Sequence, residues 1–220
     1  MAHIVITGAN RGIGLALARL FAERGDSVVV ACRKSSAELR ALKVEVHEDV
    51  EITDDNSVER FAAAIGEAPV DILVNNAAIR VPDSLRDMDL RQIRAQLEVN
   101  AIGPLRVTRA LLPKLRRGAK VVVITSRSGS IGDNGSGGDY GYRMSKAAVN
   151  MAGVNLALEL KPKGISVVLL HPGMVRTGMG GGSGAIEPEV SARRLVARID
   201  ELSLDTTGSF LHAEGRVLPW

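Results

Sequence analysis

Two side chains four residues apart could transfer a proton together. Tyr142 and Lys146 lie in a segment of helical pattern that begins near Tyr140, so they share one helix face. A nearby ammonium favours the phenolate form of a tyrosine, and a tyrosine tuned in this way can act as a general acid or base near neutral pH. Tyr140 has Met144 at the corresponding position and lacks such a partner. The pair predicts proton transfer at Tyr142, although inert Tyr/Lys pairs on helices are common.

A glycine-rich turn near the N-terminus could hold a phosphate. A short apolar run leads into Thr7-Gly8-Ala9-Asn10-Arg11-Gly12-Ile13-Gly14, and a helical pattern begins at once. Glycines allow a tight turn, a close approach of the backbone to a pyrophosphate, and close packing of helix on strand. The helix N-terminus adds free N–H groups and the positive end of its dipole. The spacing is GxxxGxG rather than GxGxxG, and a plain structural turn is the other interpretation, but the position favours dinucleotide binding.

The residues after the second apolar run predict which dinucleotide binds. An Asp or Glu about 20 residues past the glycines would accept hydrogen bonds from the ribose hydroxyls of NAD. Cys32 occupies that place, followed by Arg33 and Lys34. No carboxylate is present there to repel a 2′-phosphate, a guanidinium can hold one, and Arg11 is a second cation within reach. We therefore predict NADP rather than NAD, with a solvated Arg-Lys pair as the structural alternative.

A third candidate group lies on a helical segment near 89–116. Its apolar stripe includes Asn100, which must be hydrogen-bonded because that face is otherwise buried. Pro104 follows four residues later and has no N–H, so the carbonyl of Asn100 loses its helical donor. The free carbonyl could hold an ordered water and bend the helix. A simple kink packed against a sheet is the other interpretation.

The apolar pattern indicates the scaffold that positions these groups. Short β-branched runs recur and are continuously apolar rather than alternating, which is typical of parallel strands covered on both faces. Segments of helical periodicity separate them, so we predict an α/β fold, a doubly wound parallel sheet with helices on both faces. Ser126 follows one run and would lie at the carboxyl ends of the strands, where such sheets bind ligands. The runs are 4–6, 28–30, 72–74, 121–124 and 167–170, with 44–46 as an alternating candidate for an edge strand.

Composition excludes several classes of protein. Hydrophobic residues make up 45% of the 220 residues and charged residues 24%, so disordered, collagen-like and coiled-coil chains are excluded. A net charge of +3 is too small to indicate a polyanion partner, and aromatics at 3% are too few for the stacking platforms of single-strand binders. We expect no nucleic-acid partner.

Cysteine usage and hydropathy bear on the compartment. The single cysteine, Cys32, allows no internal disulfide and fits a reducing environment. No apolar run approaches the roughly 18 residues of a membrane span, and the N-terminal apolar piece is too short for a signal peptide. We expect a cytoplasmic protein with no membrane partner and no metal site.

Several of these residues belong to motifs that run in a fixed order along nearly the whole chain. They are TGxxxGxG at 7–14, Asp49-Val50, Asn75-Asn76-Ala77-Ala78, Asn100, Ser126, Tyr142 with Lys146, and Pro172-Gly173-Met174-Val175-Arg176-Thr177. In this combination the chain resembles the short-chain dehydrogenase/reductase family. The stretch around Ser126, the tract HPGMVRTGMGG and the closing Leu218-Pro219-Trp220 look like the branch that contains C-factor and sniffer-type carbonyl reductases.

The resemblance implies a role for each catalytic candidate. Tyr142 would donate a proton to a carbonyl oxygen as hydride arrives from the nicotinamide, and Ser126 would hydrogen-bond that oxygen. Lys146 would bind the nicotinamide ribose and bias Tyr142 toward ionisation. Asn100 would hold the water that links Lys146 to solvent, in agreement with the proline pattern.

The resemblance also implies a set of cofactor-binding positions in one Rossmann-fold domain over 1–220. These are Gly8, Asn10, Arg11, Gly12, Ile13 and Gly14 in the turn, Arg33 after the second run, Asp49 and Val50 at the adenine, Asn76 and Ala77 on the adenosine side, Tyr142 and Lys146, and the tract with Pro172, Gly173, Val175 and Thr177, of which the last two would hold the nicotinamide carboxamide.

These inferences predict an NADP-dependent oxidoreductase, preferring NADPH to NADH, that acts on a small carbonyl or alcohol. Few charges occur in the loops expected to face substrate, which favours a neutral aldehyde or ketone over a phosphorylated or CoA-linked one. An NADP-binding regulatory protein with little activity is the alternative. The resemblance implies a homodimer or homotetramer packed through the helices near 89–116 and 140–161, and the glycine-rich segment 178–184 is predicted to be a mobile lid.

Overall fold

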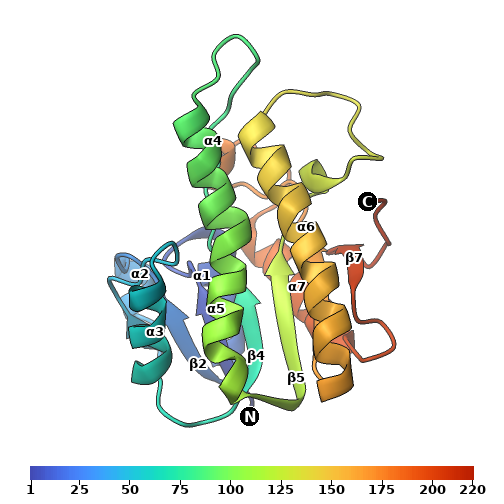
Figure 1. Ribbon diagram of the computed structural model, residues 1–220. Coiled ribbons are helices and arrows are strands. Elements are labelled where there is room, and N and C mark those ends of the chain that lie inside the picture. The colour runs from blue at the N-terminus through green and yellow to red at the C-terminus, as the bar shows by residue number, and fades with distance from the viewer.

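The structure is a computed structural model that describes residues 1–220, apart from the solvent exposure of Gly180. Seven strands form one sheet in the order β3-β2-β1-β4-β5-β6-β7, and every neighbouring pair is parallel. The predicted doubly wound parallel sheet is therefore confirmed, and the fold is Rossmann-like (Figure 1). The strands are β1 (His3–Thr7), β2 (Ser27–Ala31), β3 (Glu45–His47), β4 (Val70–Asn75), β5 (Leu115–Ile124), β6 (Ser166–His171) and β7 (Ser209–His212).

Helices cover both faces of the sheet, which explains the continuous apolar runs. Along β1, Ile4 and Ile6 pack into the core on one face, while Val5 packs into the core on the other. Both side-chain directions are therefore buried, and alternation disappears. The first face is covered by α1 (Gly12–Glu23) and α7 (Pro188–Glu201), and the second by α3 (Asp55–Ala64), α5 (Gly103–Leu111) and α6 (Tyr140–Leu160) (Figure 1). The short helices α2 (Ala37–Arg40) and α4 (Leu90–Leu97) complete the α-helical elements.

The segment predicted as one helix near 89–116 is broken by a π-helical turn. Helix α4 continues into η1 (Glu98–Ile102), α5 and the 3₁₀ turn η2 (Leu112–Lys114), where the helix ends. Because Pro104 has no N–H, the ladder changes register, and Gly103 N–H donates to the Glu98 carbonyl five residues back. The break in helical hydrogen bonding that was expected at Asn100 is therefore present, in the form of a π turn. The helix ends earlier than predicted, because β5 begins at Leu115.

Two strands differ from the sequence-based prediction. The edge strand β3 spans Glu45–His47, one residue later than predicted, and β7 has no counterpart among the predicted runs. The remaining short turns are η3 (Arg127–Gly129), η4 (Lys161–Lys163) and η5 (Gly178–Gly180). The turn η5 is the first part of the segment 178–184 that was predicted to be a lid. The exposure of Gly180 lies outside the description, and the mobility of this segment stays a prediction.

The strand order fixes where a ligand can bind. Strand β1 lies between β2 and β4, so the direction in which successive strands are added to the sheet reverses at this point, and the loops after β1 and β4 diverge to opposite faces. Residues after Thr7 and Asn75 therefore flank a crevice at the carboxyl edge. Of the helices in the described part of the chain, none is long and apolar enough to cross a bilayer.

Candidate active site

The turn after β1 needs glycine for steric reasons. Gly8 has φ +70°, and a Cβ there would lie 2.7 Å from the Cα of Ala77. At Gly14 a Cβ would lie 2.5 Å from Nδ2 of Asn76. Any larger residue would push the turn off the loop after β4. The glycines predicted from spacing are thus required by close packing at the switch point.

Asn76 braces this turn from the neighbouring loop. Its Nδ2 donates to the Thr7 carbonyl at 3.0 Å and the Gly8 carbonyl at 2.9 Å. The Thr7 hydroxyl accepts from the backbone N–H groups of Asn76 at 3.1 Å and Ala77 at 3.2 Å. Both residues predicted on the adenosine side are therefore held rigidly against the glycine turn.

The first turn of α1 presents N–H groups that no side chain caps. Arg11, the N-cap residue, is extended and exposed, while Asn10 and Ile13 are partly buried. A Cβ on Gly12 would lie 3.3 Å from Cγ2 of Thr177, so the turn also touches the tract after β6. Free N–H groups in a glycine cradle favour a bound phosphate. The structure therefore fits the dinucleotide that the sequence predicts.

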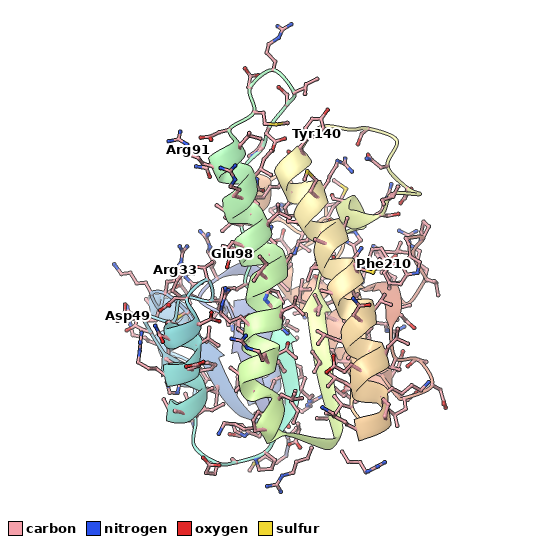
Figure 2. The ribbon with its side chains drawn as sticks, in the orientation of Figure 1. Arg33, Asp49, Arg91, Glu98, Tyr140 and Phe210 are labelled. Carbon is pink, nitrogen blue, oxygen red and sulfur yellow. The ribbon has the colours of Figure 1, made fainter. Side chains whose placement is uncertain are left out.

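The carboxyl end of β2 is tied to the loop after β3. Val50 N–H donates to the Cys32 carbonyl at 3.1 Å, and Asp49 N–H donates to the Arg33 carbonyl at 3.2 Å. Figure 2 shows Arg33 and Asp49 on the same side of the molecule. The Arg33 side chain is 72% exposed and its Nη1 lies 4.0 Å from Glu51 Oε2, so the guanidinium can turn toward a ligand.

Three side chains from two elements meet at the carboxyl edge. Ser126 follows β5, and its hydroxyl lies close enough to the Tyr142 side chain on α6 to lower the pKa of the phenol. The Nζ of Lys146, one turn along α6, lies 5.7 Å from the Tyr142 ring centroid and donates to the Ile124 carbonyl at 3.0 Å. A Cβ on Gly129 would lie 2.5 Å from the Lys146 carbonyl carbon, so η3 packs directly on α6. The structure brings together the serine, tyrosine and lysine that the sequence singled out.

Comparison with known proteins identifies the family. The family model described as short chain dehydrogenase matches residues 2–187. The chain belongs to the short-chain dehydrogenase family. A 1-hydroxy-2-glutathionyl-2-methyl-3-butene dehydrogenase of Rhodococcus sp. strain AD45 is 42% identical over 226 residues, covering 100% of both chains. The C-signal protein of Myxococcus xanthus is 44% identical over 163 residues, covering 73% of this chain and 98% of its own length.

Solved structures similar to this chain include carbonyl reductases. The NADPH-bound carbonyl reductase from chicken fatty liver superposes with a TM-score of 0.93 at 29% identity, covering 100% of this chain and 99% of its own. Carbonyl reductase Sniffer of D. melanogaster superposes with a TM-score of 0.93 at 28% identity, covering 100% of both chains. The predicted C-factor and sniffer-like branch is therefore confirmed.

Burial shifts the pKa of both titratable groups at the candidate site. Desolvation lowers the pKa of Lys146 to about 8. Desolvation raises the pKa of Tyr142, while the Ser126 hydrogen bond and the charge of Arg80 lower it. The sequence led us to expect that Lys146 would lower the pKa of Tyr142. Burial is instead the largest influence, and the charges that act on Tyr142 are those of Arg80 and Asp139; the Lys146 ammonium donates to the Ile124 carbonyl.

Arg80 is a residue that sequence reasoning missed. Its guanidinium carbon lies 5.6 Å from the centroid of the Tyr142 ring, within the range of a cation–π contact. Arg80 follows the Asn-Asn-Ala-Ala-Ile tract after β4, and the pairing of that loop with α6 is not visible in the sequence. Its charge lowers the pKa of Tyr142.

Asn100 lies in the π turn and ties three parts of the site together. Its Oδ1 accepts from the Ile79 N–H at 2.8 Å, and its Nδ2 donates to the Ile79 carbonyl at 2.8 Å and to the Ser145 hydroxyl at 2.9 Å. The side chain is buried and hydrogen-bonded, as the sequence predicted. π turns occur often at functional sites because they redirect backbone groups.

The tract that follows β6 is the last segment of the candidate site at the carboxyl edge of the sheet. Pro172 and Val175 are buried, Gly173 has φ +89°, and Val175 forms a bridge with Ile186. The preceding His171 is held neutral, because burial lowers its pKa to about 3. In the described part of the chain, no group of three His, Cys, Asp or Glu side chains is arranged to hold a metal.

The position after β2 itself holds no carboxylate, but one from another segment lies nearby. The Oε1 of Glu48 accepts a hydrogen bond from the Ser35 N–H at 2.6 Å. Glu48 lies far along the chain from Cys32, and it reaches this place only because β3 pairs with β2 in parallel. The sequence offers no local signal for this contact.

Proposed function

We propose that this short-chain dehydrogenase transfers hydride between NADP(H) and a small carbonyl or alcohol, with Tyr142 as the general acid and base. The observation that carries the proposal is the cluster of Ser126, Tyr142 and Lys146 at the carboxyl edge of the sheet. A hydroxyl beside a phenol, with an ammonium one helical turn away, is suited to polarise and protonate one carbonyl oxygen.

Each residue has a distinct part in the proposed reaction. When bound, NADPH supplies the hydride. The Tyr142 hydroxyl donates its proton to the substrate oxygen, and the Ser126 hydroxyl donates a hydrogen bond to that oxygen. Lys146 binds the nicotinamide ribose and, when ionised, stabilises the phenolate that remains. Asn100 holds the π turn against the loop after β4 and so keeps that loop in place beside Tyr142.

The cofactor proposal rests on the cradle and on cations. Uncapped N–H groups at α1 and the glycine turn would hold the pyrophosphate. Asp49 and Val50 would face the adenine, and Val175 and Thr177 the carboxamide. Arg33 supports NADPH over NADH, because an exposed guanidinium can bind a 2′-phosphate. The chicken carbonyl reductase is described as NADPH-bound, which agrees with this assignment.

The charges around the proposed site support a neutral substrate. Arg127 pairs with Asp133 at 2.6 Å, and Arg176 pairs with Glu187 at 2.6 Å. These cations are compensated by neighbours, so an uncharged aldehyde, ketone or alcohol meets little unpaired charge. The Rhodococcus relative is named for a glutathionyl alcohol, so conjugates of that kind belong in any substrate panel.

We also propose that the protein forms a homodimer or homotetramer. Apolar side chains on α5 and α6 remain exposed, among them Leu105 (39%), Met151 (64%) and Leu158 (70%). Burying them against a second copy would be favourable, since apolar area removed from water stabilises an interface. Light scattering on the purified protein measures the mass directly, and a monomer mass at micromolar concentration would contradict this proposal.

NADPH consumption by the purified protein across aldehydes, ketones, diketones and glutathionyl carbonyls tests the main proposal. We expect turnover with NADPH and at least a thousandfold loss of kcat in Tyr142→Phe, with NADPH binding retained. Tyr140→Phe is the matched control, because Tyr140 lacks a lysine one turn later. Equal activity of Tyr142→Phe and the wild type would refute the proposed acid, and absence of NADPH binding would refute the cofactor.

A further inference from the structure

The loop after β2 holds a carboxylate from the segment that follows β3. The Ser35 N–H donates to Glu48 Oε1 at 2.6 Å, and Arg40 Nη1 donates to the Ser35 hydroxyl. Glu48 is exposed, whereas Ser35 is buried with 8% of its surface accessible. The Ser35 N–H therefore holds the Glu48 carboxylate where solvent and ligands can reach it, and the Arg40 guanidinium lies behind the Ser35 hydroxyl.

The chemistry of Glu48 agrees with an anion-binding loop. Hydrogen bonds from the Ser35 side chain and backbone lower the pKa of Glu48, and the charges of Arg40 and Lys34 lower it further. The same carboxylate is close enough to Cys32 to raise the pKa of its thiol, although burial is the larger cause. Glu48 is thus ionised near neutral pH and electrostatically coupled to the end of β2.

The backbone fixes this arrangement. The Val50 N–H donates to the Cys32 carbonyl and the Asp49 N–H donates to the Arg33 carbonyl, so the two segments extend the β2–β3 ladder past the strand ends. Asp49 has φ +57°, which turns the chain at this point. Glu48 comes directly before that turn and is therefore held beside the segment that follows Arg33.

We propose that Glu48 is a specificity-determining residue for the nucleotide: its carboxylate fills the anion-binding loop at Lys34 and Ser35 and so weakens binding of a ribose 2′-phosphate relative to a ribose with a free 2′-hydroxyl. The inference rests on the proposed function, since it concerns the same nucleotide site. A 2′-phosphate must displace Glu48 or bind against its charge. A 2′-hydroxyl can donate to the carboxylate instead. Arg33 and Arg11 favour NADPH, and Glu48 opposes them.

Glu48→Gln tests this inference, because glutamine keeps the shape and removes the charge. Removing one negative charge several ångströms from a phosphate in partly screened surroundings should tighten binding about fivefold. We expect that gain for NADPH and for 2′,5′-ADP, which has no nicotinamide, and none for NADH or 5′-AMP. Isothermal titration calorimetry at two salt concentrations measures all four dissociation constants, and the gain should shrink at the higher salt.

Two further variants keep the result interpretable. Glu45→Gln removes the same charge from β3, but the Glu45 carboxylate pairs with His47 rather than with the Ser35 loop, so we expect no change in discrimination. Glu48→Asp keeps the charge and should stay closer to the wild type than Glu48→Gln does. Far-ultraviolet circular dichroism at the titration temperature checks that each variant is folded.

The outcomes separate this inference from the proposed function. If the wild type binds NADPH or NADH and Glu48→Gln leaves their ratio unchanged, or shifts both equally, the role of Glu48 is refuted and the proposed function stands. If the wild type binds neither dinucleotide nor either adenosine fragment, the proposed function fails and the inference fails with it. A fivefold gain in Glu45→Gln as well would show a general charge effect and would also overturn the assignment.

Discussion

The buried lysine at the proposed active site should make the cofactor-free protein less stable than it would be with a neutral residue. Lys146 is 2% exposed, and its Nζ donates one hydrogen bond, to the Ile124 carbonyl at 3.0 Å. Among the described residues no carboxylate forms an ion pair with it. Burial lowers its pKa from 10.5 to about 8, and since one pKa unit corresponds to about 1.36 kcal/mol, the charged form destabilises the folded state by about 3 kcal/mol.

The sign and pH window follow from proton linkage. Below pH 8 the lysine is protonated in both states, so the folded state carries the whole penalty. Between about pH 8 and 10.5 the folded lysine has released its proton while the unfolded one keeps it, so stability rises with pH through this window. Lys146→Met removes the charge and the hydrogen bond, and the lost bond costs about 1 kcal/mol.

We therefore expect Lys146→Met to be more stable than the wild type by about 2 kcal/mol at pH 7, and less stable by about 1 kcal/mol above pH 10.5. Urea unfolding followed by far-ultraviolet circular dichroism, at several pH values from 7 to 11, measures both free energies. Every other group titrates in both proteins, so the difference isolates Lys146. Lys161→Met is the control: Lys161 is exposed, so its change should stay within about 0.5 kcal/mol.

Two results would refute this reasoning. A Lys146→Met variant that is less stable than the wild type at pH 7 would show that the buried ammonium is not penalised. A stability difference that stays constant from pH 7 to 11 would show that the lysine does not titrate in the expected window. Loss of activity in this variant is expected in either case, because Lys146 is proposed to bind the ribose.

Two further predictions concern the turn and the tyrosine. Gly8→Ala should lower the free energy of unfolding by about 3 kcal/mol, because φ is +70° and a Cβ would lie 2.7 Å from a backbone atom. Gly25 has φ +88° and open space around it, so Gly25→Ala should lower the free energy of unfolding by only about 1 kcal/mol. Calorimetry of both variants measures the two losses, and equal losses would contradict this reasoning. Arg80→Gln should raise the pKa of Tyr142, since the guanidinium charge lowers it, and so move the acidic limb of the pH profile of alcohol oxidation, where Tyr142 must lose its proton, to higher pH; an unmoved pH profile would count against a role for Arg80.

Local sequence predicted the scaffold because its signals are short-range. Strand β1 and the turn after it could be predicted since burial on both faces leaves a continuous apolar run, and the spacing of Gly8, Gly12 and Gly14 is a covalent property of the chain. The spacing of Tyr142 and Lys146 likewise placed them on one helix face. Strand β7 was missed because its four residues, Ser209–His212, alternate in burial and carry little β-branched character.

Tertiary structure decided the electrostatics of the site. The π turn at Asn100 depends on a change of hydrogen-bond register that Pro104 makes necessary but does not specify. The pKa of Lys146 depends on burial by elements distant in sequence. Glu48 reaches Ser35 only through the parallel pairing of β3 with β2. Periodicity and spacing report what neighbouring residues share, whereas charge interactions and desolvation depend on which distant segments the fold brings together, so the sequence determined the elements and the tertiary structure determined their chemistry.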